Sequence, residues 1–165
     1  MQSLVPLTEQ DACRLICPWC GRAARGTGGF RVVRGGATIG AAVLAPPERG
    51  SDLCPPRSAV LTRLWVRPDD VGEHVGTQLV QRVCAELLAS DLRHLVAYGT
   101  RGRPDCAHLP VGWLAVVGFA DHGGTQWRID LRRAAPSLGF VRDAASGLLR
   151  GWRPGRDKPA PANRG

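Results

Sequence analysis

The sequence predicts an α/β protein with a mixed central sheet flanked by helices, and three observations predict it. A Gly-Gly pair separates two apolar runs near the start, an apolar pattern of helical spacing lies between two strand-like runs, and a second Gly-Gly pair separates two late runs. Hairpins favour antiparallel pairing, whereas a helix between two strands favours parallel pairing. The order hairpin, strand, helix, strand, helix, hairpin therefore predicts a sheet that contains both.

The first half of this pattern begins after residues 1–28, which are rich in cysteine and are expected to be irregular. Two β-like runs, 30–34 and 37–44, flank Gly35-Gly36 and predict a hairpin. Paired prolines mark a loop up to residue 56. A third strand is predicted over 59–66, because this apolar run ends just before Pro68.

The second half contains the strongest helical signal. Val75, Leu79, Val83 and Leu87 recur at helical spacing and predict a helix over 74–91. The remaining elements are a strand at 94–98, a polar loop at 101–109, a helix at 111–117 ended by Gly118, a closing hairpin at 119–122 and 125–131, and an amphipathic helix at 137–152.

The basic charge of the chain is spread unevenly. The formal net charge is +8, and Lys158 is the only lysine among 22 basic residues. Residues 151–165 combine arginines with proline and glycine, which predicts a flexible basic tail. Elsewhere no basic cluster is interleaved with aromatic residues, so we do not expect a nucleic-acid partner. We therefore divide the chain into a cysteine-rich segment (1–28), one folded domain (29–150) and the tail (151–165).

Neither a membrane span nor a secretion signal is expected. The longest apolar stretch, 111–120, is too short to cross a bilayer. The first residues carry Glu9 and Asp11 in place of a basic region followed by an apolar run. We therefore expect a soluble, cytoplasmic protein that does not engage a membrane.

Residues 64–79 predict an anion-binding loop. They contain a strand that stops at a proline, a short loop with two glycines, and the start of a helix. The first N–H groups of a helix have no partner within it, and the helix dipole places about half a positive charge there. This arrangement is suited to a phosphate group.

The order and spacing of these elements resemble the GNAT superfamily of acyl-CoA-dependent N-acyltransferases. The resemblance covers residues 30–133 and rests on strand 64–66, loop 72–79 and the run 110–119, which ends in Val-Gly-Phe. It implies acetyl-CoA as cofactor, with the pantetheine arm along the strand and the pyrophosphate on the loop. The cofactor-binding residues that it implies are Leu64, Trp65, Val66, Gly72, Glu73, His74, Val75, Gly76 and Thr77.

Three positions depart from the family pattern. Val71 stands where the loop motif of the family has Gln or Arg, and His74 stands where it has the first of its two final glycines. Leu114 replaces a tyrosine that many members use to protonate the leaving thiolate. Asp69, Asp70 and Glu73 also crowd the expected phosphate site. The identity of the catalytic residues is therefore open, and the candidates are Tyr98, His108 and Asp105.

The N-terminal cysteines predict a metal site. Cys13, Cys17 and Cys20 have the spacing C-x3-C-x2-C, which suits either three irons of an iron–sulfur cluster or a zinc ion with a fourth ligand such as Cys54. Cys84 and Cys106 are expected to be ordinary apolar or exposed thiols.

Three functional hypotheses follow. The first is an N-acetyltransferase that moves an acetyl group from acetyl-CoA to an amine of a small molecule or a protein. The second is a non-catalytic binding or regulatory module with the same fold. The third is a metal- or cluster-binding protein that uses Cys13, Cys17 and Cys20. The oligomeric state is open, with a homodimer as one alternative.

Overall fold

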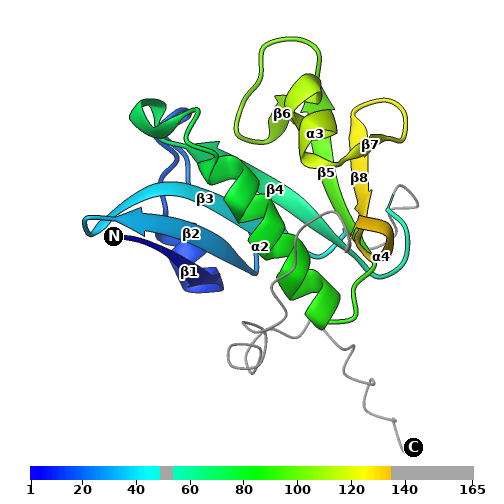
Figure 1. The fold of residues 1–165 in the computed structure, drawn as a ribbon, viewed down its shortest axis with the longest axis horizontal. Helices are drawn as coiled ribbons and strands as arrows, with labels where there is room; N and C mark the ends of the chain where they lie inside the picture. Colours follow the sequence, from blue (N-terminus) through cyan, green and yellow to red (C-terminus); the bar gives the residue numbers. More distant parts are fainter. Residues whose placement is uncertain (49–53, 135–165) are drawn as a thin grey trace, which may run out of the picture.

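The computed structural model describes residues 1–48 and 54–134, and these build one mixed sheet (Figure 1). Along the sheet the order is β1-β2-β3-β4-β5-β8-β7, and β6 pairs with β5 off this path. The strands are β1 (Gln2–Thr8), β2 (Gly28–Arg34), β3 (Ala37–Ala45), β4 (Ser58–Val66), β5 (His94–Thr100), β6 (His108–Pro110), β7 (Ala120–Asp121) and β8 (Gln126–Asp130). The predicted fold class is confirmed.

Helices lie against this sheet. They are α1 (Glu9–Arg14), α2 (Val75–Ala89), α3 (Val111–Val117) and α4 (Leu131–Ala134), and a 3₁₀ turn covers Pro68–Asp70. The longest, α2, crosses one face over β2, β3 and β4 (Figure 1). It packs there because Leu79, Val83 and Leu87 form a fully buried apolar stripe.

The sheet separates two apolar cores. Along β3, Ala42 and Leu44 point to the core under α2, whereas the alternate residues Ala41 and Val43 point to a smaller core on the opposite face. The N-terminal segment covers that second face, where Cys17 joins the smaller core. Residues 1–28 are therefore built into the same packed unit as the sheet.

Several predicted elements are confirmed with small shifts in their ends. Both hairpins form around their Gly-Gly pairs, with Gly35 and Gly36 at φ of 57° and 80°. Helix α2 occupies most of 74–91, and α3 has the predicted bounds with Gly118 as its C-cap. The expected helix at 137–152 and the basic tail lie outside the described residues.

Two expectations were wrong. The first residues are not irregular, because β1 pairs antiparallel with β2 and a capping box between Thr8 and Asp11 starts α1. Pro6 is tolerated in β1 because an edge strand need not donate a hydrogen bond at every residue. The loop at 101–109 also ends in a short strand, β6, which pairs in parallel with β5.

β4 and β5 are paired along only part of their length. They are parallel partners only from Ser58 to Val60, opposite His94 to Val96. Thr62 is an extra residue on β4, because Val43 faces Arg63 while Leu44 faces Leu61. Such a bulge bends its strand and increases its twist. The two strands therefore open a gap beyond the bulge.

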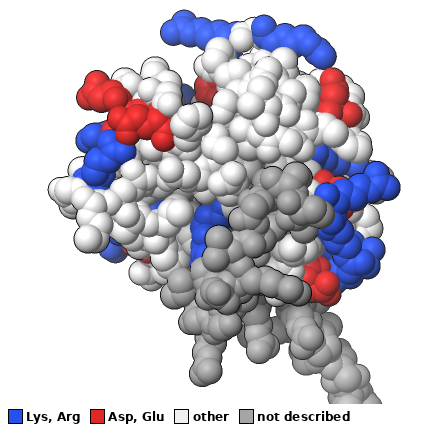
Figure 2. Space-filling model, in the orientation of Figure 1, with Lys and Arg blue, Asp and Glu red and all other residues white. Residues whose placement is uncertain are grey.

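In the part of the chain that the structure describes, no helix has the length and apolarity needed to cross a lipid bilayer. On the face shown in Figure 2, acidic and basic side chains lie close together at the left and right edges. On this face the positive charge is therefore not gathered into one patch.

Candidate acyl-CoA site

An apolar pocket of about 360 Å³ lies along the last residues of β4. Leu64, Trp65 and Val66, which the sequence predicts to contact a cofactor, all line it. The opposite wall comes from the segment between β5 and α3, and Trp19 of the N-terminal segment completes it. The remaining lining residues are Val71, Pro104, Asp105, Cys106, Leu109, Pro110 and Trp113.

The chain itself occupies part of the gap between β4 and β5. Tyr98 of β5 faces Gln126 of β8 on one edge and His108 of β6 on the other, so β6 lies on the side of β4. Just before β6, the carbonyl of Cys106 accepts a hydrogen bond of 2.9 Å from the Leu64 N–H. A main-chain group of β4 that faces the gap is therefore already engaged.

The loop before α2 has the backbone of an anion cradle. Gly72 has φ of +93°, with open space where a Cβ would stand. His74 is the N-cap of α2 with φ of +60°, and its side chain makes no capping bond. Helix geometry leaves the N–H groups of Val75, Gly76 and Thr77 without partners inside the helix. These donors and the helix dipole favour an anion at this point.

Gly76 lies close to the side chains of the pocket wall. A Cβ at this position would lie 3.2 Å from Cζ2 of Trp113 and 3.7 Å from Cγ2 of Val66. Trp113 and Val66 both line the pocket. Gly76 therefore brings the start of α2 close to the pocket wall, and a bulky residue there would push on the wall.

The acids of this loop are paired with arginines. Asp70, whose side chain is only 5% exposed, accepts bonds of 2.9 Å from Nη1 of Arg34 and Nε of Arg67. Glu73 pairs with Nη2 of Arg34 at 2.5 Å. These two carboxylates are therefore directed at arginines, and their charge is locally balanced. Asp69 is exposed.

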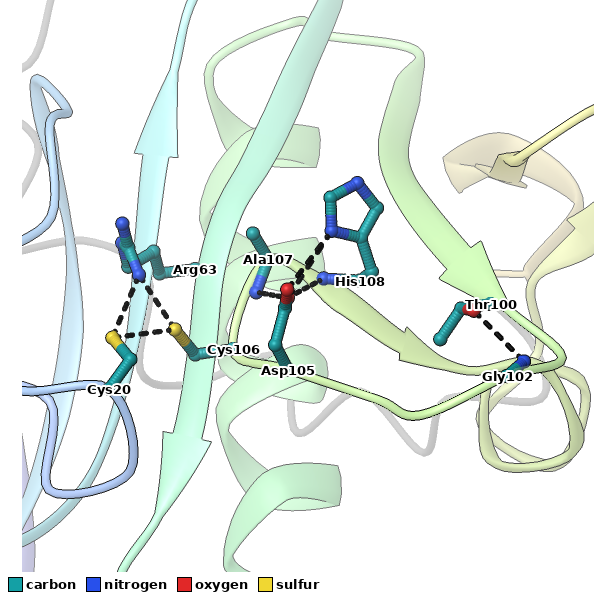
Figure 3. Close-up of polar contacts among 8 residues, drawn as sticks. All are labelled: Cys20, Arg63, Thr100, Gly102, Asp105, Cys106, Ala107 and His108. Carbon is teal, nitrogen blue, oxygen red and sulfur yellow. Dashed lines mark hydrogen bonds and ion pairs between the residues drawn. The ribbon is translucent and has the colours of Figure 1, made fainter.

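The candidate catalytic residues are close together but differ in their relation to the pocket. Asp105 lines it, and its carboxylate lies 3.3 Å from Nδ1 of His108 (Figure 3). Asp105 also accepts bonds from the N–H groups of Ala107 and His108, and these contacts lower its pKa against the opposing effect of burial. Burial raises the pKa of Tyr98, and neither Tyr98 nor His108 is among the residues that line the pocket.

The structure brings together a different set of cysteines from the predicted one. Cys17 and Cys20 lie beside Cys106, and their Sγ atoms are all within 4.8 Å of one another. Cys13 is exposed on α1 and is not part of this group. Figure 3 shows Cys20 and Cys106 with the Arg63 guanidinium beside both sulfurs. Cys106 is therefore the residue that sequence reasoning missed.

Comparison with protein-family models and with curated proteins found no match. Solved structures do match. The ribosomal-protein-S18-alanine N-acetyltransferase from Escherichia coli is 17% identical over 78% of this chain and 90% of its own, with a TM-score of 0.53.

Two further solved structures are similar to this chain. A proposed acetyltransferase from Exiguobacterium sp. 255-15 is 15% identical over 67% of this chain and 66% of its own, with a TM-score of 0.52. A proposed GNAT-family acetyltransferase from Desulfovibrio desulfuricans is 14% identical over 63% of this chain and 69% of its own, with a TM-score of 0.50. The chain therefore has the fold of the GNAT acetyltransferases.

Proposed function

We propose that this chain is an N-acetyltransferase that moves an acetyl group from acetyl-CoA to an amine. The pocket along Leu64, Trp65 and Val66 carries the proposal, because it is apolar and lies on the strand next to the anion cradle. A thioester on a long pantetheine arm that is joined to a charged diphosphate needs both features together. The fold that the chain shares with acetyltransferases also supports this proposed activity.

The residues have separate roles in this proposal. The N–H groups at the start of α2 hold the pyrophosphate, while Gly72 and His74 give the loop its shape. The end of β4 aligns the pantetheine arm. Acyl transfer then depends on holding the amine and the thioester carbon in contact, which is a large source of rate enhancement.

His108 is the group that we propose to accept the proton of the attacking amine. Its Nδ1 is oriented by Asp105, and this leaves Nε2 free to act as base. Replacement of His108 by alanine should then lower kcat by about 10²-fold or more and leave acetyl-CoA affinity unchanged. Replacement of Tyr98 by phenylalanine tests the other candidate in the same assay.

Titration calorimetry with acetyl-CoA tests the proposal directly. We expect micromolar binding, weaker binding of acetyl-pantetheine, which lacks the nucleotide, and turnover with members of an amine panel. The panel includes peptides with a free α-amino group, because the Escherichia coli neighbour is an N-acetyltransferase of a ribosomal protein. Folded protein that binds no acetyl-CoA at millimolar concentration would overturn the proposal.

A non-catalytic module is the second candidate, and one observation favours it. The Leu64 N–H is bonded to Cys106, and the Val66 carbonyl accepts a bond from the Trp19 indole, so two main-chain groups expected to meet the cofactor are already satisfied. Binding of acetyl-CoA without turnover of any tested amine, or no binding at all, would favour this alternative.

A further inference from the structure

Two distant parts of the chain supply three thiols to one point. Cys17 and Cys20 come from the N-terminal segment, and Cys106 comes from the loop that fills the gap between β4 and β5. The Sγ atoms of Cys20 and Cys106 are 3.3 Å apart (Figure 3), and with the Sγ of Cys17 all three lie within 4.8 Å of one another. Cys106 also lines the pocket, but the proposed acetyl transfer assigns no chemical step to any of these three thiols.

We propose that Cys17, Cys20 and Cys106 bind one zinc ion through their thiolates. Zinc holds thiolate sulfurs at about 2.3 Å, so two sulfurs of a tetrahedral site stand about 3.8 Å apart. The observed separations, from 3.3 Å up to a limit of 4.8 Å, bracket that value. An iron–sulfur cubane distributes its ligands over separate irons and holds them farther apart, so one ion fits this group better.

Main-chain hydrogen bonds fix the turn that carries Cys17 and Cys20. The Gly21 N–H donates to the Cys17 carbonyl at 2.9 Å, and the Cys17 N–H donates to the Arg22 carbonyl at 3.0 Å. Gly21 has φ of +65°, the left-handed conformation that closes the turn. Two residues between paired cysteines is a common spacing in structural zinc sites. The backbone therefore presents both sulfurs on one side without rearrangement.

The charge around the sulfurs favours thiolates. Three thiolates and one zinc ion carry a net charge of −1, and Arg63 lies where it can offset that charge. Its Nη1 is 2.6 Å from the Cys106 sulfur and 3.2 Å from the Cys20 sulfur. Arg63 is therefore placed to balance the charge that a zinc ion bound by three thiolates would carry.

An ion at this point would join the N-terminal segment to the loop before β6. Cys17 and Cys106 are buried in the smaller core, while Cys20 is exposed. The residues that the structure describes supply three ligands to this group. The ion would also hold the carbonyl of Cys106 against the Leu64 N–H.

Cobalt titration of the reduced, chelator-treated full chain tests this site, because tetrahedral Co²⁺–thiolate sites give intense visible and charge-transfer bands. We expect one cobalt per chain, displaced by one zinc. The variant C20S should weaken cobalt binding by roughly a hundredfold. The variant C13S is the matched control, since Cys13 is also exposed but lies outside the group, and we expect it to bind like the parent protein.

Cys20 is replaced first because its side chain is exposed, so we expect the C20S variant to fold. Circular dichroism checks that the fold is kept. The variant C106S then tests the third ligand. Absence of cobalt bands with all thiols reduced would overturn the proposal. So would equal loss of binding in C13S and C20S, or a Cys20–Cys106 disulfide in mass spectra of protein purified with zinc. Acetyl-CoA plays no part in these readouts, so they stand apart from the proposed transfer.

Discussion

The indole nitrogen of Trp19 donates a hydrogen bond of 2.6 Å to the main-chain carbonyl of Val66. This contact joins the N-terminal segment to the last residue of β4, 47 positions later in the chain. The Trp19 side chain is nevertheless exposed and forms one edge of the pocket. The N-terminal segment therefore closes the side of the proposed cofactor site.

Replacement of Trp19 by phenylalanine should strengthen acetyl-CoA binding. The change keeps an aromatic ring at the pocket edge but removes the indole N–H, which frees the Val66 carbonyl for an amide of the pantetheine arm. One neutral hydrogen bond contributes about 0.5–1.5 kcal/mol, which corresponds to an affinity gain of up to about tenfold. Calorimetry measures the gain, and unchanged or weaker binding would show that the arm does not use this carbonyl.

Replacement of His74 by aspartate should weaken acetyl-CoA binding while it stabilises the protein. Aspartate and asparagine both tolerate the left-handed conformation of this N-cap, so H74N is a neutral control of nearly the same shape. A carboxylate at a helix N-terminus stabilises the helix by about 0.3–1 kcal/mol. The same charge about 8 Å from a diphosphate costs about 2 kcal/mol at an effective dielectric constant near 20.

The two measurements for His74 are thermal unfolding and calorimetry. We expect H74D to bind acetyl-CoA roughly tenfold more weakly than H74N once salt screening is included, with a difference that shrinks as salt is added. Equal affinities of the two variants would place the diphosphate away from the start of α2.

Asp70 should contribute more to stability than Glu73. The Asp70 side chain is 5% exposed and bonds two arginines, whereas the Glu73 side chain is 49% exposed and bonds one. We expect D70N to lower the free energy of unfolding by about 2 kcal/mol, because buried charge pairs are costly to break. E73Q should cost less than about 1 kcal/mol. Urea unfolding compares them, with the exposed-site variant D69N as control, and the reverse order would contradict the pairing seen here.

Alkaline pH should destabilise the metal-free protein through Cys84. Burial raises the pKa of this thiol from its ordinary value of 9.0 to about 12 in the folded protein. The folded state therefore keeps a proton that the unfolded state loses, so the stabilising contribution is complete below pH 9 and falls as the pH rises toward 12. One such group lowers the free energy of unfolding by up to about 1.4 kcal/mol per pH unit.

The variant C84A isolates this effect. Loss of a buried thiol lowers stability at every pH, so the readout is the slope of unfolding free energy between pH 9 and pH 11. We expect a shallower slope in C84A than in the parent protein. Burial also raises the pKa of Cys106 to about 12, so part of the slope should remain. Parallel slopes would contradict the assignment to Cys84.

The sheet and its main helix were predictable because their signals are local. The Gly-Gly turns and the apolar spacing of α2 act within a few residues of where they appear in the sequence. β1 and β6 were missed for the opposite reason. Each contains a proline, Pro6 or Pro110, and each is a strand because a neighbouring strand pairs with it.

The candidate site also contains residues that local sequence signals pointed to and residues that they could not. Leu64, Trp65 and Val66 line one pocket, and the resemblance that singled them out rests on a strand leading into a glycine loop, which is visible in the sequence. Cys106 lies 86 positions from Cys20, and Arg34 lies 36 positions from Asp70. Such contacts arise only when the sheet brings distant segments together, so no spacing rule could have identified them.

The hydrogen bond from Leu64 to the carbonyl of Cys106 has a kinetic consequence. A cofactor arm that used the Leu64 N–H would have to wait until the loop before β6 released it, so the loop would act as a gate to the strand. In rapid-mixing experiments the observed association rate would then level off at high acetyl-CoA, at the rate of loop opening. An ion that anchors Cys106 would lower that plateau and slow cofactor entry without touching the cofactor.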